Sequence, residues 1–171
     1  MKPIKVSELI EGLELDSEER VTRVDLQNSC VVSVDRSLLS AFEEGDEDVA
    51  RNLPDWQKEE AEIARAMVED SGDRFVRAPD KFEFHEYRHM ERFIGTVEDA
   101  EAVEQLWRAI KGKGAFRYFK DTASRLGLLE DWYRYRADAM KEFVMDWAEA
   151  NNIRCEDDVK GRKGRARRNE P

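Results

Sequence analysis

The chain has 171 residues and a net charge of −10, with 39 Asp/Glu against 29 Lys/Arg. This length favours one domain with a modest core, and the acidic balance argues against nucleic-acid binding by the protein as a whole. No apolar run approaches the ~20 residues that cross a bilayer, and the start, MKPIKVSELIEGLEL, lacks the apolar core of a secretory signal. We therefore expect a cytoplasmic protein that does not enter a membrane. Cys30 and Cys155 are isolated, which indicates reduced thiols.

The charge is unevenly distributed along the chain. Residues 1–104 hold 28 Asp/Glu against 13 Lys/Arg, a balance of −15. Residues 105–136 hold 3 Asp/Glu against 8 Lys/Arg, a balance of +5. We therefore expect a site for an anion in the second half of the chain.

Alternation of apolar residues predicts a β-hairpin near the start. Before the hairpin, residues 4–15, IKVSELIEGLEL, are expected to form a short amphipathic helix with Ser7 as its N-cap. In residues 20–35, Val24 and Leu26, and then Val32 and Val34, alternate on either side of the turn-forming run Gln-Asn-Ser. Residues 36–52, RSLLSAFEEGDEDVARN, begin as a helix and continue as an acidic linker.

A longer helix and a third strand follow. Pro54 opens the helix PDWQKEEAEIARAMVED, on which Trp56, Ile63 and Met67 share a face at helical spacing. The short run DRFVRAP predicts a strand over Phe75–Arg77.

The second half has helical patterns throughout. Asp80 and Glu83 form a capping box for a helix through about Ile94, and Thr96 and Asp99 form another for the next helix. The apolar residues of that next helix are Val97, Ala100, Val103, Trp107 and Ile110.

Two further helices are expected after the interruption KGKG. The first runs from Ala115 to Leu126 and ends at Gly127. The second runs from about Leu129 to Asn151, and its buried side chains are expected to be Trp132, Ala139, Met140, Phe143 and Trp147. Inward-facing side chains of the first are expected to be Phe116, Phe119, Ala123 and Leu126.

The predicted fold class is α+β: a small antiparallel sheet, made of the hairpin and one further strand, packed against a mainly α-helical C-terminal half. We expect residues 1–153 to form a single domain. Residues 154–171, RCEDDVKGRKGRARRNEP, lack aromatic residues and periodicity, which predicts a disordered basic tail.

Five stretches resemble a known family: LPDWQKEE, RFVRAP, HEYRHMERFI, GKGAFRYFKD and DWYRYRADAMKEFVMDWAEANNI. In this order they are similar to an uncharacterised bacterial protein family of the numbered UPF series, UPF0158. The resemblance covers roughly residues 4–153 and is most specific over Gly114–Arg136. It implies a bacterial domain with no established activity, cofactor or catalytic residues. It also implies that the run His-Glu-Tyr at 85–87 belongs to the family pattern, whereas His89 does not.

The stretch HEYRH, residues 85–89, holds both histidines and matches the zinc-protease motif. No third ligand follows the second histidine, and helical spacing places His85, His89 and Arg92 together, opposite the apolar residues. We therefore expect two solvent-facing histidines beside cations and interpret the match as fortuitous. No cofactor is expected.

The stretch KGKGAFRYFKD fits an anion site better. If a helix begins near Gly114, its first N–H groups are unpaired and its dipole is positive there, while glycines allow an anion to approach the backbone. The candidate anion-binding residues are Lys111, Lys113, Gly114, Arg117, Lys120 and Arg125. In the alternative interpretation, the glycines only make a tight turn and the cations form a solvated face.

Two other stretches are weaker candidates. DWYRYR offers Tyr133 and Tyr135 to stacked bases, but helical spacing favours core packing of Trp132. The tail KGRKGRARR suits phosphate backbones or a merely solubilising role.

The sequence therefore favours a non-enzymatic binding domain that recognises an anionic partner, nucleic acid or a phosphate-bearing ligand, through residues 111–125. The alternative is a protein–protein interaction or regulatory adaptor, in which the acidic first half docks on a basic partner. A zinc-dependent hydrolase that uses His85, Glu86 and His89 is the third hypothesis.

Overall fold

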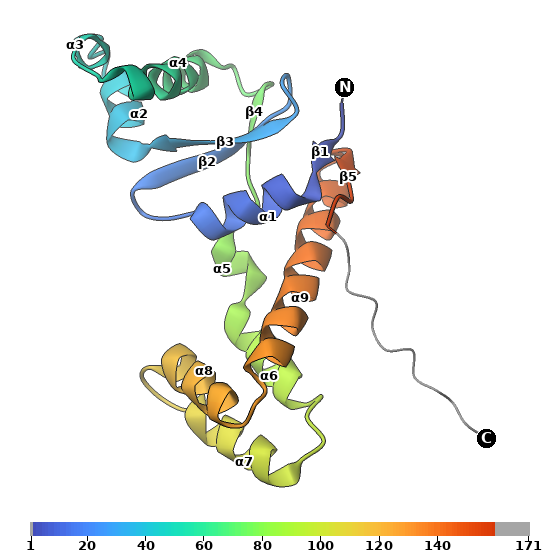
Figure 1. Cartoon of the computed structure of the whole chain (residues 1–171). Coiled ribbons are helices and arrows are strands. Elements are labelled where there is room, and N and C mark those ends of the chain that lie inside the picture. Colours follow the sequence, from blue (N-terminus) through green and yellow to red (C-terminus); the bar gives the residue numbers. More distant parts are fainter. Residues whose placement is uncertain (1, 160–171) are drawn as a thin grey trace. The chain divides into compact units, whose positions relative to one another are not determined.

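A computed structural model describes residues 2–159, whose contacts divide the chain into two compact units. Unit 1 consists of Met1–Lys81 and Val144–Pro171, and unit 2 of Phe82–Phe143. The described residues form an antiparallel sheet and a pair of short parallel strands, and helices predominate in the second half (Figure 1). The predicted α+β class is confirmed, whereas a single domain over residues 1–153 stays a prediction.

The antiparallel sheet of unit 1 has the strand order β3-β2-β4. Its strands are β2 (Arg20–Asp25), β3 (Cys30–Asp35) and β4 (Phe75–Arg77). Val24 of β2 lies opposite Val31 of β3 and Val76 of β4. The predicted hairpin and third strand are confirmed, except that Leu26 belongs to the turn, where its N–H donates to the Arg74 carbonyl at 2.9 Å.

Strand β3 lies at one edge of the sheet, and side chains form hydrogen bonds with its outward-facing backbone groups. Glu60 accepts a hydrogen bond from the backbone N–H of Asp35 at 2.6 Å. Arg20 donates to the Ser33 carbonyl at 2.6 Å and pairs with Glu60 at 3.0 Å. Because these groups are already bound, this part of the edge is protected against pairing with another strand.

Three helices of unit 1 contact this sheet: α1 (Val6–Leu15), α2 (Arg36–Glu43) and α4 (Asp55–Glu69). The short helix α3 (Asp48–Arg51) lies between α2 and α4 in the chain. The core holds Val21, Val34, Leu38, Leu39, Phe42, Ala61 and Ala64. Ile63 and Met67 pack against it, but Trp56 is 75% exposed, so the prediction that Trp56 shares their buried face is wrong. The fully buried residues of α4 are Ala61 and Ala64, both more than one turn beyond Trp56.

The two ends of unit 1 are joined by a parallel strand pair. Strand β1 (Ile4–Lys5) pairs with β5 (Cys155–Glu156), although the sequence predicts disorder from residue 154. Ser7 does not cap α1, because the N-cap residue is Lys5. The Ser7 hydroxyl instead donates to the Asp158 carboxylate at 2.5 Å. Composition cannot reveal such a partner, because the pairing joins residues about 150 positions apart. The rest of the predicted tail, residues 160–171, lies outside the described residues.

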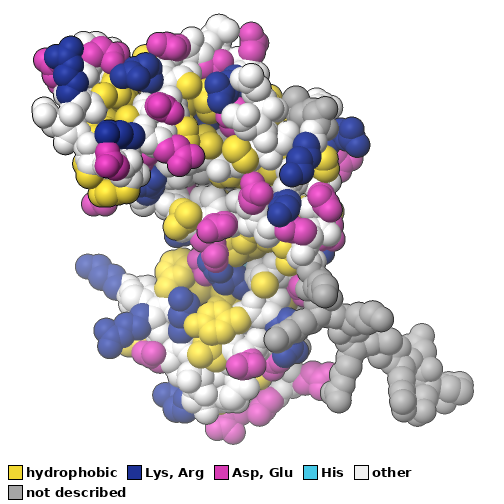
Figure 2. Space-filling model, turned by 45° about the horizontal axis from the view of Figure 1, so that its top comes forward, with side chains coloured by type: hydrophobic (Ala, Val, Ile, Leu, Met, Phe, Trp, Pro, Cys, Tyr) yellow, Lys and Arg dark blue, Asp and Glu magenta, His cyan; other side chains and the backbone are white. Residues whose placement is uncertain are grey.

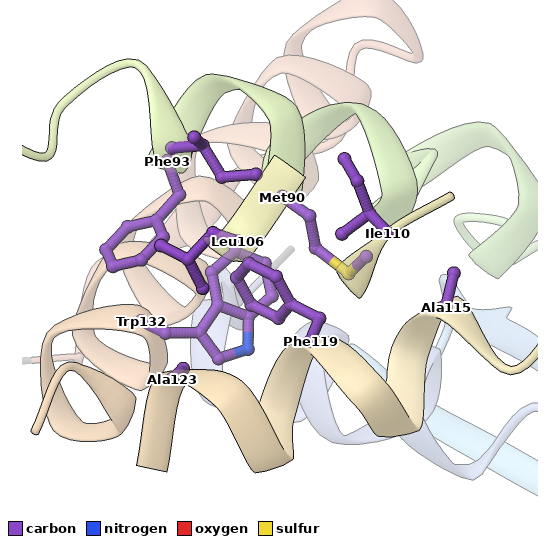
Figure 3. Packing of buried hydrophobic residues seen from close by; sticks show 9 residues of the cluster. Met90, Phe93, Leu106, Ile110, Ala115, Phe119, Ala123 and Trp132 are labelled. Carbon is purple, nitrogen blue, oxygen red and sulfur yellow. The ribbon is translucent and has the colours of Figure 1, made fainter. Parts of the chain in front are cut away.

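Unit 2 is helical and has its own core. Its helices are α5 (Lys81–Phe84, from Phe82 onwards), α6 (Glu86–Ile94), α7 (Ala100–Ala109), α8 (Ala115–Arg125) and the first part of α9 (Leu129–Ala150). Phe93, Phe119 and Trp132 meet edge to face, with ring centroids 5.0 to 6.1 Å apart (Figure 3). Met90, Leu106, Ile110, Ala115 and Ala123 complete the buried cluster together with Ile94.

Two predicted helices differ from the structure in their bounds. The helix expected to run through Ile94 is broken at His85, whose φ of +52° separates α5 from α6. Helix α7 begins later than the predicted capping box implies: Asp99 caps it by accepting from the N–H groups of Glu101 and Ala102. Thr96 instead donates to the Phe93 carbonyl at 2.7 Å. A capping motif in the sequence therefore does not by itself fix the bounds of a helix.

Within residues 2–159, no helix combines the length and the apolar composition needed to cross a bilayer. Helix α9 has 22 residues but carries acidic and basic side chains throughout.

Candidate functional site

Helices α7 and α8 pack together as a hairpin of helices, joined by residues 110–114. Gly112 and Gly114 both have positive φ, +85° and +77°, which favours glycine in this connection. Residues 105–120, which we call the hairpin tip, contain five Lys/Arg and no Asp/Glu. The glycines therefore form a tight turn, and this turn lies within a segment rich in cations.

Three cations of the hairpin tip are exposed and unpaired. Among residues 2–159, Lys111, Lys113 and Lys120 make no ion pair within 4.0 Å. Arg117, the fourth cation, lies 3.8 Å from Asp121 one turn further along α8. An anion that approaches the three lysines therefore does not have to displace an intramolecular ion pair.

Arg108, the fifth cation of the tip, and Arg125 are both partnered from α7. The Arg108 guanidinium pairs with the carboxylate of Glu104 one turn earlier. The Arg125 guanidinium lies 3.4 Å from the side-chain oxygen of Gln105. Both arginines are on the surface, where such contacts contribute little and exchange easily with a ligand.

A groove of about 640 Å³ lies between α7 and α8. Its α7 side is formed by Glu101, Glu104, Gln105, Arg108 and Ala109, and its α8 side by Tyr118, Thr122 and Arg125, with Lys111 of the connection also lining it. Of the predicted anion-binding residues, Lys111 and Arg125 line the groove. Lys113, Gly114, Arg117 and Lys120 do not, and they belong to the neighbouring surface of the tip.

The groove is not uniformly basic. Arg108 and Lys111 lie where α7 ends, whereas Glu101 lies about 10 Å earlier along the helix axis. An anion is therefore favoured at the end next to the hairpin connection and disfavoured at the other.

Aromatic side chains of the hairpin tip are exposed, which the sequence did not predict. Trp107 is 37%, Phe116 46% and Tyr118 56% exposed, although Phe116 was expected to face inward. Figure 2 shows hydrophobic side chains beside Lys and Arg on one surface of unit 2. A signal was present: Ala115, Phe119 and Ala123 recur every fourth residue and bury one face of α8, which leaves 116 and 118 outside it.

The stretch HEYRH does not form a zinc-protease helix. His85 precedes α6 and is exposed, whereas His89 is half-buried with its ring stacked on Phe84 at 4.3 Å between centroids. The prediction that both histidines face solvent is therefore wrong for His89. Burial, and then the nearby Arg92, lower the pKa of His89.

The residues between the two histidines hold the helices of unit 2 together. Glu86 pairs with Arg136 of α9 at 2.6 Å, and both side chains are about one-fifth exposed. The Tyr87 hydroxyl donates to the Ile110 carbonyl, at the end of α7, at 3.1 Å. The glutamate that would activate water in a zinc protease is thus engaged in an ion pair, and no three His, Cys, Asp or Glu side chains of residues 2–159 are grouped to hold a metal.

The stretch DWYRYR is mainly structural. Trp132 is fully buried, and Tyr135 packs edge to face on Phe93 at 5.6 Å. Tyr133 is 49% exposed, and Arg134 lies 3.6 Å from Asp131. The predicted core packing of Trp132 is confirmed, and the two tyrosines diverge as helical spacing indicates.

Comparisons with known proteins agree with the quoted motifs. The model of the "Uncharacterised protein family (UPF0158)" matches residues 4–160. A UPF0158 protein of Pseudomonas aeruginosa is 35% identical over 65 residues, which are 37% of this chain and 42% of that relative. No solved structure matches the chain. The match to the family model includes the ion pair of Glu86 and the whole basic hairpin, and the chain belongs to the uncharacterised protein family UPF0158.

Proposed function

We propose that this protein is a non-enzymatic binding protein that recognises an anionic partner, nucleic acid or a phosphate-bearing ligand, through the hairpin tip. The observation that supports the proposal is the separation of charge on one pair of helices. Residues 105–120 hold all five cations of the tip and no acid, while unit 2 as a whole has 11 Lys/Arg against 12 Asp/Glu.

The arrangement suits a phosphate backbone in two respects. Lys111, Lys113 and Lys120 have no intramolecular ion pair to break, so their charges are available to a ligand. Charges are screened over ~8–10 Å at physiological ionic strength, so the field at the hairpin tip depends mainly on charges within that distance and not on the net charge of the chain.

A charge-reversal experiment tests the proposal. The variant Lys111→Glu, Lys113→Glu, Lys120→Glu should lose retention on heparin and RNA. If each lysine contacts one phosphate of a single strand, the slope of log Kd against log salt should fall by about 2. A variant with Lys2, Arg51 and Lys58 changed to Glu has the same net charge but keeps the tip, and it should bind almost as the wild type does.

The basic segment 160–171 needs its own control, because it contains six Lys/Arg. Changing these six residues to Gln in the full-length chain should weaken binding only slightly. If binding disappears in this variant and survives in the triple-glutamate variant, the hairpin tip is not the anion site.

A protein–protein interaction is the second candidate, and a separate observation favours it. Residues 2–81 and 144–159 hold 26 Asp/Glu against 12 Lys/Arg. Trp56 is 75% exposed at the start of α4, directly after Asp55, whose side chain is 93% exposed. An exposed tryptophan in an acidic part of the chain suits a basic protein partner.

A pull-down after nuclease treatment distinguishes the two candidates. One stoichiometric protein that is recovered by the wild type and the triple-glutamate variant, but lost with Trp56→Ala, would support the adaptor function. Recovery that depends on Lys111, Lys113 and Lys120 and vanishes with nuclease would support the nucleic-acid function.

A further inference from the structure

The hairpin tip exposes aromatic rings that its core does not use. Phe93, Phe119 and Trp132 already fill the interior of unit 2. Tyr118 and Phe116, on the same helix as Phe119, keep about half of their surface open to solvent. Because large apolar surface is normally buried, exposed rings among cations indicate a surface that binds a partner.

Tyr118 is the ring best placed for this purpose. It lines the groove together with Arg108 and Lys111, so two cations lie on the same surface as the ring. Its ring rests on Gly114: a Cβ at that glycine would lie only 3.0 Å from the ring. The backbone thus supports Tyr118 while 56% of the residue stays exposed.

An exposed ring that shares a groove with cations matches the chemistry of a single nucleic-acid strand. Unpaired bases expose their faces and stack on aromatic side chains, and the adjoining phosphates contact Lys or Arg. A duplex hides its base faces and offers mainly phosphates to the same cations. Glu101 and Glu104 precede Arg108 on α7 and disfavour phosphates, which restricts the contact to the tip.

We infer that the anionic partner is single-stranded nucleic acid, with one base stacked on Tyr118 and the adjoining phosphates on Lys111 and Arg108. This inference rests on the proposed anion-binding function of the hairpin tip. It adds a base-dependent contact, which charge alone does not produce.

The test compares two strands that differ only in their bases. One is an oligothymidylate of about 12 nucleotides, within the usual site sizes of single-strand binders, and the other is an abasic strand of the same length. The full-length wild type should bind the thymidylate strand about tenfold more tightly than the abasic strand. Contacts of segment 160–171 with phosphates are the same for both strands and cancel in this ratio.

Substitution of Tyr118 identifies the ring responsible. Tyr118→Leu should remove the tenfold preference and leave heparin and abasic-strand binding unchanged, whereas Tyr118→Phe should keep the preference. An oligothymidylate–oligoadenylate duplex of the same length should bind more weakly than the single strand.

The possible failures are distinguishable. Equal affinity of the wild type for thymidylate and abasic strands, or equal weakening of both by Tyr118→Leu, overturns the stacking inference and leaves the anion-binding proposal in place. A duplex that binds as tightly as the single strand also overturns it. Absence of binding to heparin and to both strands overturns the inference and the proposed function together.

Discussion

The imidazole ring of His89 stacks on the phenyl ring of Phe84, with centroids 4.3 Å apart and ring planes inclined by 19°. The contact joins residues on either side of the break between α5 and α6, where His85 has a φ of +52°. It therefore links two helices that the sequence presents as one. Because of this contact, His89 of the zinc-like motif is half-buried and not exposed to solvent as predicted.

We expect this contact to weaken as the pH falls. Burial, followed by Arg92, lowers the pKa of His89 from its ordinary 6.5, against the opposing effects of the Phe84 carbonyl, Glu142 and Glu86. The unfolded chain then binds a proton more readily than the folded one, so stability is complete above pH 6.5 and declines as the pH falls below that value. The measurement is the free energy of unfolding by urea between pH 7.5 and 5.

The variant His89→Phe isolates this effect from the titration of the carboxylates. It should keep the stacked contact with Phe84 and show a smaller loss of stability than the wild type over the same pH range. Identical pH profiles for wild type and His89→Phe would contradict the prediction.

Trp132 should tolerate Phe far better than Ala. Its side chain is completely buried, and its indole N–H has no hydrogen-bond partner among the described residues. Trp132→Phe therefore removes an unsatisfied donor along with some volume, and we expect a loss of less than ~1.5 kcal/mol in unfolding free energy. Trp132→Ala leaves a large cavity and should cost about 3–5 kcal/mol.

Trp107→Phe is a suitable control for this pair, because Trp107 is 37% exposed. It should change the unfolding free energy by less than ~0.5 kcal/mol. A Trp132→Phe variant as unstable as Trp132→Ala would show that the indole N–H makes a bond essential to the core.

The ion pair of Asp25 and Arg74 should matter much more than exposed ion pairs. Asp25 is only 2% exposed and lies 2.7 Å from the Arg74 guanidinium. Burial acts to raise the pKa of Asp25, but hydrogen bonds from Arg74 and Asn28 outweigh it and lower the pKa below its ordinary 3.8. Asp25→Ala leaves these donors without their acceptor, and we expect a loss of about 3–5 kcal/mol in unfolding free energy.

The exposed pair of Asp55 and Lys58 provides the matched control. Its carboxylate is 93% exposed, so Asp55→Ala should cost less than ~1 kcal/mol. The pKa of Asp25 is lower in the folded state than in the unfolded chain. The contribution of Asp25 to stability is therefore complete above pH 3.8 and is lost as the pH falls through the lower, folded-state pKa. Similar losses for both alanine variants at pH 7 would contradict the prediction.

Two glycines of the hairpin connection should respond differently to Ala. Both have positive φ, so either substitution carries a backbone cost of about 1–2 kcal/mol. A Cβ at Gly112 meets no atom within 4 Å, whereas one at Gly114 approaches the Tyr118 ring to 3.0 Å. Urea unfolding should therefore show a larger loss for Gly114→Ala, and equal losses would mean that Tyr118 moves aside freely.

Glu104→Gln should strengthen binding of a single strand by the hairpin tip. The substitution removes a negative charge from the groove and releases Arg108 from its ion pair. Because Arg108 no longer has to leave Glu104 before it contacts the phosphate, the dissociation constant at a fixed salt concentration should fall by up to about fivefold. Asp131→Gln, which removes a charge outside the groove, should leave the dissociation constant almost unchanged; no change with Glu104→Gln would argue against Arg108 as a phosphate ligand.

Much of the secondary structure follows from short stretches of sequence. The alternation of Val24, Val32 and Val34 predicts the hairpin, and the run Phe75–Arg77 is a strand in the structure with the predicted bounds. Helix α8 likewise starts at Ala115, as expected after Gly114. These features depend on neighbours within about ten residues, and local patterns therefore contain the necessary information.

The candidate site was only partly predictable. The charge count located the basic segment, including Lys111 and Lys113, and the charges could be read from the sequence directly. The exposure of Phe116 could also be inferred, because Ala115, Phe119 and Ala123 recur every fourth residue and define a buried face of α8 that leaves position 116 outside. The groove itself depends on how α7 and α8 pack, and no local pattern contains that information.

By itself, the sequence determined the family, the α+β class, most of the strands and helices, and the reversal of charge after residue 104. Only the tertiary structure decided that β5 pairs with β1, that His89 stacks on Phe84, and that Tyr118 shares a groove with Arg108 and Lys111. The physical reason is the range of the interactions. Propensity and periodicity act between near neighbours along the chain, whereas burial and pairing depend on residues that only folding brings together.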